Sequence, residues 1–221
     1  MKKLIFLFFI LVFSFPAFSQ NWKTVKMDSA VSFKLPKGFI KTKAEGENNF
    51  SAQTAFGTIL IFKTPDDPLL TPDIEKDKNL NKFYSEYLNR IQKSISDGKI
   101  TDEKDTLLGE LKVKDFTLSI DTGSGNQFRK FRILHANNAT YTFEFLFQEI
   151  HKDYAAEECN LFFNSISVNE DMNRTDQFTA DNIPGTGPNY YLIGGVMVML
   201  AGIIVFFVIQ KLRRTDSKKK A

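Results

Sequence analysis

Twenty consecutive uncharged residues near the C-terminus, at 190–209, constrain this chain more than any other feature. They read YYLIGGVMVMLAGIIVFFVI, and as a helix they would be long enough to cross a hydrocarbon core about 30 Å thick. Basic residues follow, beginning with Lys211, Arg213 and Arg214. Because basic residues are retained on the cytoplasmic side of a membrane, we predict a transmembrane helix at 190–209 and a basic cytoplasmic tail at 210–221.

The two ends of this apolar segment carry side chains that are typical of membrane interfaces. Tyr190 and Tyr191 begin it, while Lys211, Arg213 and Arg214 follow it. Tyrosine rings favour the level of the lipid headgroups, and basic side chains favour anionic headgroups on the cytoplasmic face. We therefore expect these five residues to flank a membrane anchor, with membrane lipid as a direct partner.

The N-terminus carries a second segment that is directed to a membrane. Two lysines precede an apolar run at 4–15, and Ala-Phe-Ser at 17–19 has the small residues of a cleavage site. This pattern is typical of a secretory signal peptide, and the apolar run is too short for a membrane span. Residues 1–19 are therefore predicted to be removed, so that the chain from Gln20 onward is exported.

Composition restricts the source and the partners of the exported part. With 23 Phe and many Lys and Asn, the chain resembles proteins of AT-rich bacteria, so we expect a periplasmic domain tethered to the cytoplasmic (inner) membrane. Residues 20–189 hold 21 basic and 25 acidic residues, a net charge of −4. A mildly acidic domain without a basic stripe is not expected to bind nucleic acid. Cys159 is the single cysteine, so the domain has no internal disulfide.

Residues 20–168 have the length and the patterns of one α+β domain. Alternating apolar residues between turn residues indicate strands near 31–35, 49–65, 106–120, 127–136 and 139–150. A repeat of three or four residues predicts helices at 78–97, stopped by Gly98, and at 153–166. Residues 169–189 lose this periodicity and gain Pro, Gly and acids, as a linker does. We predict a mostly antiparallel sheet with two packed helices, plus the C-terminal transmembrane helix.

Three segments of this domain resemble the PsbP family. They are VSFKLPKGF at 31–39, the long helix, and YTFEFLF at 141–147 followed by a helix ending LFFNSISV at 161–168. The resemblance covers residues 22–168 and implies a PsbP-like fold. It also implies an exported or membrane-attached accessory protein that binds or helps to assemble other proteins, generally without chemistry or a cofactor of its own. The apolar segment at 190–209 departs from the family.

One stretch could carry chemistry. Asp121-Thr122-Gly123 follows an apolar strand, as the catalytic carboxylate of aspartic proteases does, and a single such motif would need a dimer to supply the second carboxylate. The surrounding residues, TGSGN, are those of a short hairpin loop, because Gly and Asn tolerate positive φ. We predict that Asp121 caps a turn, and we keep a dimeric membrane-anchored aspartic protease as the alternative.

The remaining candidates have simpler interpretations. His135 on a strand and His151 before a helix lack the Cys or carboxylate spacing of a zinc site, so we expect surface or capping histidines and no metal. Cys159 shares a helical face with Phe162 and Ile166, which places its thiol in the core. The predicted function is a non-enzymatic, membrane-anchored binding or assembly module, and its expected partner is another envelope protein.

Overall fold

The computed structural model describes residues 21–44, 47–67, 71–95 and 98–179. The predicted signal peptide, transmembrane helix and cytoplasmic tail therefore lie outside the described residues. Within those four ranges, no helix combines the length and the apolar character that a membrane span requires.

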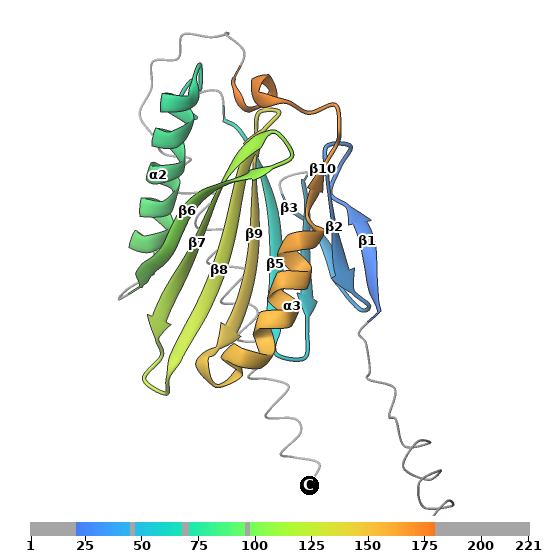
Figure 1. The fold of residues 1–221 in the computed structure, drawn as a ribbon, viewed down its shortest axis with the longest axis vertical. Helices are drawn as coiled ribbons and strands as arrows, with labels where there is room; N and C mark the ends of the chain where they lie inside the picture. Colours follow the sequence, from blue (N-terminus) through green and yellow to red (C-terminus); the bar gives the residue numbers. More distant parts are fainter. Residues whose placement is uncertain (1–20, 45–46, 68–70, 96–97, 180–221) are drawn as a thin grey trace, which may run out of the picture.

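A seven-stranded sheet forms the centre of the domain (Figure 1). In spatial order its strands are β3 (Ile40–Ala44), β4 (Glu47–Gln53), β5 (Gly57–Pro65), β9 (Ala139–Gln148), β8 (Asn126–Ala136), β7 (Leu111–Asp121) and β6 (Lys99–Leu108). Every neighbouring pair is antiparallel. The long connection in this sheet runs from β5 to β6 and contains the helix α2 (Asp77–Lys93).

A smaller sheet and a second helix cover one face of the large sheet. The small sheet has the order β1 (Trp22–Lys26), β2 (Val31–Pro36) and β10 (Ser167–Val168). The helix α3 (Lys152–Ser165) follows a short 3₁₀ turn, η1 (Glu149–His151). The helix α2 packs on the opposite face (Figure 1). The predicted class, α+β with a mostly antiparallel sheet and two packed helices, is confirmed.

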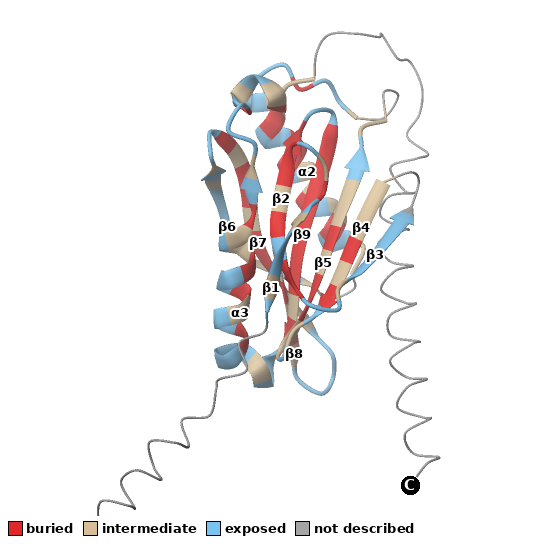
Figure 2. Cartoon of the chain, turned by 90° about the vertical axis from the view of Figure 1, so that its right-hand side faces the viewer, coloured by how far each residue is buried: buried red, intermediate tan, exposed pale blue. Residues whose placement is uncertain are grey.

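The main core lies between the large sheet, the small sheet and α3. Every second side chain of β9, from Tyr141 to Phe147, belongs to it. The ring of Phe143 lies 6.1 Å from that of Phe33 on β2 and 6.5 Å from that of Phe162 on α3. The aromatic row on β9 therefore joins three elements in one core. Figure 2 shows the buried positions along β2, β5, β7 and β9, and exposed ones on β1, β3 and the outer side of α3.

A second core lies between α2 and the other face of β7 and β8. Its buried members from α2 recur at the predicted helical spacing and are Leu80, Phe83, Tyr84, Leu88 and Ile91. They pack on strand residues that include Phe116 and Phe131, whose rings stack across β7 and β8 with centroids 4.7 Å apart. The large sheet thus carries apolar residues on both faces.

The helix α2 is shorter than the sequence predicts. It ends at Lys93, and Gly98 lies beyond its end instead of stopping it. A Cβ atom at Gly98 would lie only 2.9 Å from Cδ1 of Leu118, so glycine allows the chain to pass close to β7. The strand β6 begins at the next residue, Lys99, in a charged stretch that the apolar alternation does not mark as a strand.

The polar face of β9 is buried, although its alternation predicts a sheet with one covered side. Thr142 and Glu144 are buried because both have partners on the α2 side. The hydroxyl groups of Tyr87 and Thr142 are hydrogen-bonded at 2.8 Å. Arg129 on β8 donates two hydrogen bonds to the carboxylate of Glu144, at 2.5 and 2.9 Å. The expectation of an open side is therefore wrong, since paired polar groups allow this face to be covered as well.

The chain remains packed on the domain beyond residue 168, where the sequence predicts a linker. Met172 is buried, and so is Gln177, the last residue of a short 3₁₀ turn, η2 (Arg174–Gln177). The N–H of Thr179 donates to the carbonyl of Ile74 at 3.0 Å, and the N–H of Ile74 donates to the Thr179 hydroxyl at 2.7 Å. The packed part of the chain therefore reaches Thr179.

Candidate functional site

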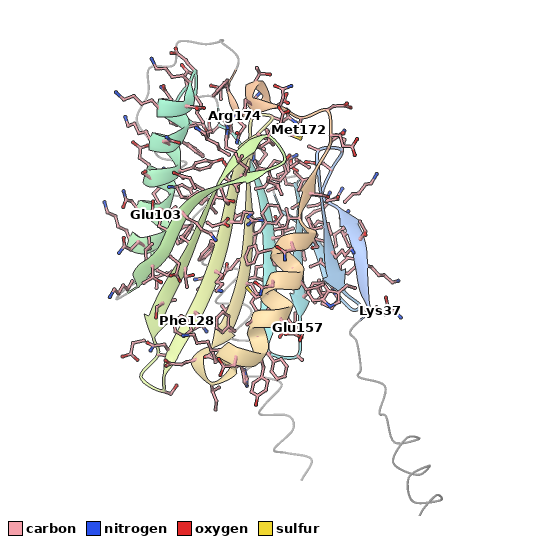
Figure 3. All side chains as sticks on the ribbon, viewed as in Figure 1. Lys37, Glu103, Phe128, Glu157, Met172 and Arg174 are labelled. Atoms are coloured by element: carbon pink, nitrogen blue, oxygen red, sulfur yellow. The ribbon has the colours of Figure 1, made fainter. Side chains whose placement is uncertain are left out.

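A groove with a volume of about 560 Å³ lies between α3 and the strands β6, β7 and β8. This volume is within the range of known ligand sites, about 300–1,000 Å³. The sheet contributes Asp102, Glu103, Lys104, Asp115, Phe116, Thr117, Lys130, Phe131 and Arg132, and α3 contributes Cys159, Asn160, Phe163 and Asn164. Glu103 marks its outer edge, to the left of α3 in Figure 3. We call it the helix–strand groove.

The groove exists because α3 covers only part of the large sheet. Its buried residues, Ala155, Cys159 and Phe162, belong to the main core with β2 and β9. Asn160 and Asn164 are exposed and line the groove. Residues four positions apart lie on the same side of a helix, so these two amides form one wall. The strands β6, β7 and β8, which lie to the left of α3 in Figure 1, form the floor.

Arg132 joins the floor of the groove to its wall. Its Nε and Nη2 atoms each donate to the carboxylate of Asp115 at 2.8 Å, and its Nη1 atom donates to the carbonyl of Phe163 at 3.1 Å. Asp115 lies on β7 and Phe163 near the end of α3, so one guanidinium connects two strands and the helix. Two parallel hydrogen bonds to a carboxylate hold a planar guanidinium in one orientation. This contact therefore fixes the width of the groove.

A β-bulge in β6 decides which charges face the groove. The pairing with β7 shifts by one residue between Thr101 and Lys104, so Asp102 and Glu103 together oppose a single residue of β7. Asp102 has a positive φ of 54°, a conformation that non-glycine residues rarely adopt. Beyond the bulge, Lys104 lies opposite Asp115. The bulge thus places the Lys104 ammonium group on the groove face, because a bulge changes the face toward which the following side chains point.

Without the bulge, the pairing of β6 with β7 would bring like charges together. Glu103 would lie opposite Asp115, and Lys104 would lie opposite Lys114, arrangements that destabilise a sheet. With the bulge, Asp105 lies opposite Lys114 and the two side chains form an ion pair at 2.7 Å. The bulge therefore matches opposite charges on both faces of the sheet.

Six polar side chains of the groove have no side-chain partner among the described residues, namely Asp102, Lys104, Thr117, Lys130, Asn160 and Asn164. Lys104 and Lys130 form no ion pair there, and the amides of Asn160 and Asn164 form no side-chain hydrogen bond. An ammonium group donates three hydrogen bonds and attracts anions, while an amide both donates and accepts. The groove can therefore bind a ligand through charge and hydrogen bonds without breaking contacts of its own.

Cys159 lines the groove, but its thiol is not suited to nucleophilic chemistry. The side chain is 2% exposed, which confirms the predicted core position. Burial raises the pKa of the Cys159 thiol to about 11, although the charge of Lys130 acts in the opposite direction. The thiol therefore stays protonated near neutral pH, and only the thiolate is a nucleophile.

The carboxylate of Asp121 is used within a turn. Its Oδ1 atom accepts a hydrogen bond from the N–H of Gly123 at 2.8 Å. Gly123 and Gly125 have positive φ angles of 74° and 120°, and the Thr122 hydroxyl donates to the carbonyl of Gly125 at 2.6 Å. The predicted hairpin loop is therefore confirmed, and Asp121 lies at its exposed tip, outside the set of residues that line the groove.

His135 is enclosed, so the expectation of a surface or capping histidine is wrong for this residue. Its Nε2 atom lies 2.8 Å from Oδ2 of Asp66, and its Nδ1 atom lies 3.2 Å from the carbonyl oxygen of Gln177. Both partners are distant in sequence, which is why residue spacing did not reveal them. His151 directly precedes α3 and forms no capping hydrogen bond, and its ring packs 5.8 Å from that of Phe56.

The structure brings no further predicted site residue to the groove. The predicted anchor flanks lie outside the described residues and are Tyr190, Tyr191, Lys211, Arg213 and Arg214. In the parts of the chain that the structure describes, no three His, Cys, Asp or Glu side chains form a group that could hold a metal ion.

Comparison with known proteins gives similarities of fold. No protein-family model matches the chain, and no curated protein matches its sequence. Among solved structures, the chain is similar to CyanoP, the cyanobacterial PsbP of Synechocystis, with 10% identity, a TM-score of 0.48, and coverage of 70% of this chain and 96% of that one. It is also similar to LpqN of Mycobacterium tuberculosis, with 12% identity, a TM-score of 0.42, and coverage of 67% and 91%.

A eukaryotic protein is also among the similar solved structures. The Ran-binding protein Mog1p of Saccharomyces cerevisiae is similar with 12% identity, a TM-score of 0.41, and coverage of 73% of this chain and 100% of that one. At these identities the likeness concerns the fold alone and assigns no residue a role. The predicted resemblance to the PsbP family is confirmed at this level, as a similarity in the course of the chain.

Proposed function

We propose that this chain is a membrane-anchored, non-enzymatic binding or assembly module whose domain faces the periplasm. Residues 1–19 direct export, residues 190–209 anchor the chain in the cytoplasmic membrane, and residues 210–221 stay in the cytoplasm. The observation that carries the binding role is the helix–strand groove, in which six polar side chains lack partners among the described residues. The partners are membrane lipid at the anchor and another envelope protein at the groove.

The position of Thr179 supports an anchor close to the domain. This residue is hydrogen-bonded to Ile74, and only residues 180–189 separate it from the predicted span. Ten extended residues reach at most about 35 Å. Thr179 follows η2, the short orange turn at the top of Figure 1, whereas α3, which lines the groove, lies along the side of the domain. An anchor at the η2 end would therefore leave the groove accessible to a neighbouring protein.

The chemistry of the groove favours binding over catalysis. Asp115 could act as a base, but Arg132 holds its carboxylate through two hydrogen bonds. The Cys159 thiol is protonated, because burial raises its pKa. The groups left for a ligand are two ammonium groups, two amides, the Thr117 hydroxyl and the exposed Asp102 carboxylate. The hydroxyl and the carboxylate are not hydrogen-bonded to each other, so they do not form the nucleophile–base pair of covalent catalysis.

Cross-linking from the groove tests the binding role. Benzoylphenylalanine, a photoactivatable residue, is placed at Asn164 in the full chain in native membranes. The matched control is Asn89, another exposed asparagine, which lies on α2 and therefore on the opposite face of the sheet. Because a ligand in the groove would lie against residue 164, we expect a discrete cross-linked product from this position and none from residue 89. Equal products from both positions, or no product from either, would contradict the proposed binding role.

A further inference from the structure

We propose that the helix–strand groove binds an extended peptide segment of the partner protein and places an acidic side chain of that peptide at Lys130. The assignment rests on the proposed binding role of the groove and specifies the chemistry of its ligand. It depends on three properties of the lining residues: the unpaired ammonium groups on the floor, the position of the carboxylates, and the spacing of the amides on the wall.

Once its ion pairs with other described residues are taken into account, the floor of the groove keeps two unpaired ammonium groups and one unpaired carboxylate, that of Asp102. The strand pairing places Lys104, Lys130 and Arg132 on the same face as Asp115. Arg132 neutralises Asp115 through two hydrogen bonds of 2.8 Å, so two ammonium groups are left. An ammonium group next to a protein wall interacts with a carboxylate more strongly than it does in bulk water. The floor is therefore complementary to an acidic group.

The other carboxylates of the lining lie on β6, away from Lys130. Glu103 forms an ion pair with Lys114 at 3.1 Å, and Asp102 is exposed at the bulge. Lys130 lies on β8, two strand spacings or about 10 Å from β6. Its charge acts on the Cys159 thiol, which places its ammonium group beside α3. Lys130 is therefore the position where an acidic side chain meets the least repulsion.

The two amides on α3 fit the backbone of an extended peptide. Asn160 and Asn164 are four residues apart on the helix, a rise of about 6 Å. In an extended chain, every second residue recurs after about 6.5 Å and directs its backbone N–H and C=O groups toward the same edge. Each amide offers both a donor and an acceptor, so the pair can bind two successive N–H and C=O groups on one edge of a peptide. A compact anion would use Lys130 but would not span both amides, which would stay in contact with water.

Selection from a peptide library tests this ligand class. Phage-displayed random decapeptides are selected against the full chain in nanodiscs of neutral lipid, after removal of phages that bind empty nanodiscs. We expect the enriched peptides to share one Asp or Glu at a fixed position. Lys130→Gln removes the cation without adding a carboxylate next to Asp115, and it should lower the affinity for these peptides about tenfold or more, as the loss of one charge-assisted hydrogen bond predicts.

Two further variants separate charge from backbone recognition. The double variant Asn160→Ala with Asn164→Ala should lower the affinity for every selected peptide. A new selection against this variant should still enrich an acidic residue at the fixed position. Lys78→Glu, at an exposed position on α2 outside the groove, should change neither affinity nor selection. Enriched peptides without a shared acid, an acidic preference that survives Lys130→Gln, or no enrichment at all would each overturn the assignment. Cross-linking from residue 164 reports on the groove independently, so it shows whether the binding role fails as well.

Discussion

Replacing Glu144 by leucine is expected to lower the free energy of unfolding by about 3–5 kcal/mol. Glu144 is fully buried on β9 and accepts two hydrogen bonds from Arg129, which is also buried. The variant leaves the guanidinium charged, enclosed and without its partner. A charge without compensation in a low-dielectric core costs far more than the loss of an exposed ion pair. Chemical denaturation of the full chain in detergent, followed by circular dichroism, measures the change.

A double variant separates the unpaired charge from the loss of packing. Arg129→Met together with Glu144→Leu replaces both charged side chains by apolar ones of comparable volume. Such replacements are neutral or stabilising by about 1–4 kcal/mol relative to the ion pair. We therefore expect the double variant to be far more stable than Glu144→Leu alone. A double variant as unstable as the single one would show that the packing of these side chains, and not the isolated charge, causes the loss.

Replacing Gln177 by methionine is expected to lower the free energy of unfolding by about 2–4 kcal/mol and to release residues 169–179 from the domain. The Gln177 side chain is fully buried. Its Oε1 atom accepts from the N–H of Lys112 at 2.8 Å, and its Nε2 atom donates to the carbonyls of Lys112 at 2.8 Å and His135 at 3.0 Å. Methionine fills a similar volume but offers neither an acceptor to the N–H of Lys112 nor a donor to the two carbonyls, of which that of Lys112 keeps the Tyr84 hydroxyl at 2.9 Å. Each buried group left without a partner costs about 1–3 kcal/mol.

Hydrogen exchange distinguishes this local effect from a general loss of stability. The amide protons of Met172 and Thr179 are hydrogen-bonded in the structure, and both should exchange faster in Gln177→Met. The matched control is Gln148→Met, at an exposed position at the end of β9, which should change stability by less than about 0.5 kcal/mol. Unchanged exchange at Met172 and Thr179 in Gln177→Met would show that Gln177 does not hold residues 169–179 on the domain.

The hydrogen bonds of Gln177 also affect how far the domain can lie from its membrane anchor. Thr179 is hydrogen-bonded to Ile74, so in the proposed function the release of residues 169–179 would lengthen the tether by eleven residues. If these residues are fully extended, the distance between the domain and the anchor increases by at most about 40 Å. Gln177 would then decide whether the groove is held near the membrane surface.

The elements that could be predicted from the sequence are those with a sustained periodic pattern. The aromatic residues of β9 occupy every second position from Tyr141 to Phe147, and the buried residues of α2 and α3 follow the helical repeat. Such patterns depend on neighbours in sequence alone, because one face of each element must be apolar. The hairpin loop at Asp121 was predictable for a similar reason, since its glycines directly supply the positive φ that the turn requires.

The strand β6 could not be predicted because its sequence lacks a regular alternation of apolar and polar residues. Five of its ten residues are charged, and the bulge at Asp102 and Glu103 interrupts the alternation. The strand is recognisable only from its partner β7, where opposite charges face one another across the pair. The buried state of Glu144 was missed for a comparable reason, because it depends on Arg129 in a neighbouring strand and on the cover that α2 provides.

The helix–strand groove is a property of tertiary structure alone. Its lining residues come from three strands and from α3, which follows them in the chain. Lys104 faces the groove only because the bulge shifts the register, and Asn160 and Asn164 face it only because the opposite side of α3 is buried. His135 illustrates the same limit, since its partners Asp66 and Gln177 lie 69 and 42 residues away in sequence.

Protease accessibility tests the central claim most directly, because every proposed role of the groove requires that the domain be outside the cytoplasm. A protease is added to spheroplasts that carry the full chain with an epitope after Ala221. The account predicts that residues 20–189 are digested while the epitope and the span at 190–209 are protected, and that lysis exposes the epitope. Protection of the domain in intact spheroplasts, or digestion of the epitope without lysis, would contradict the proposed membrane-anchored module.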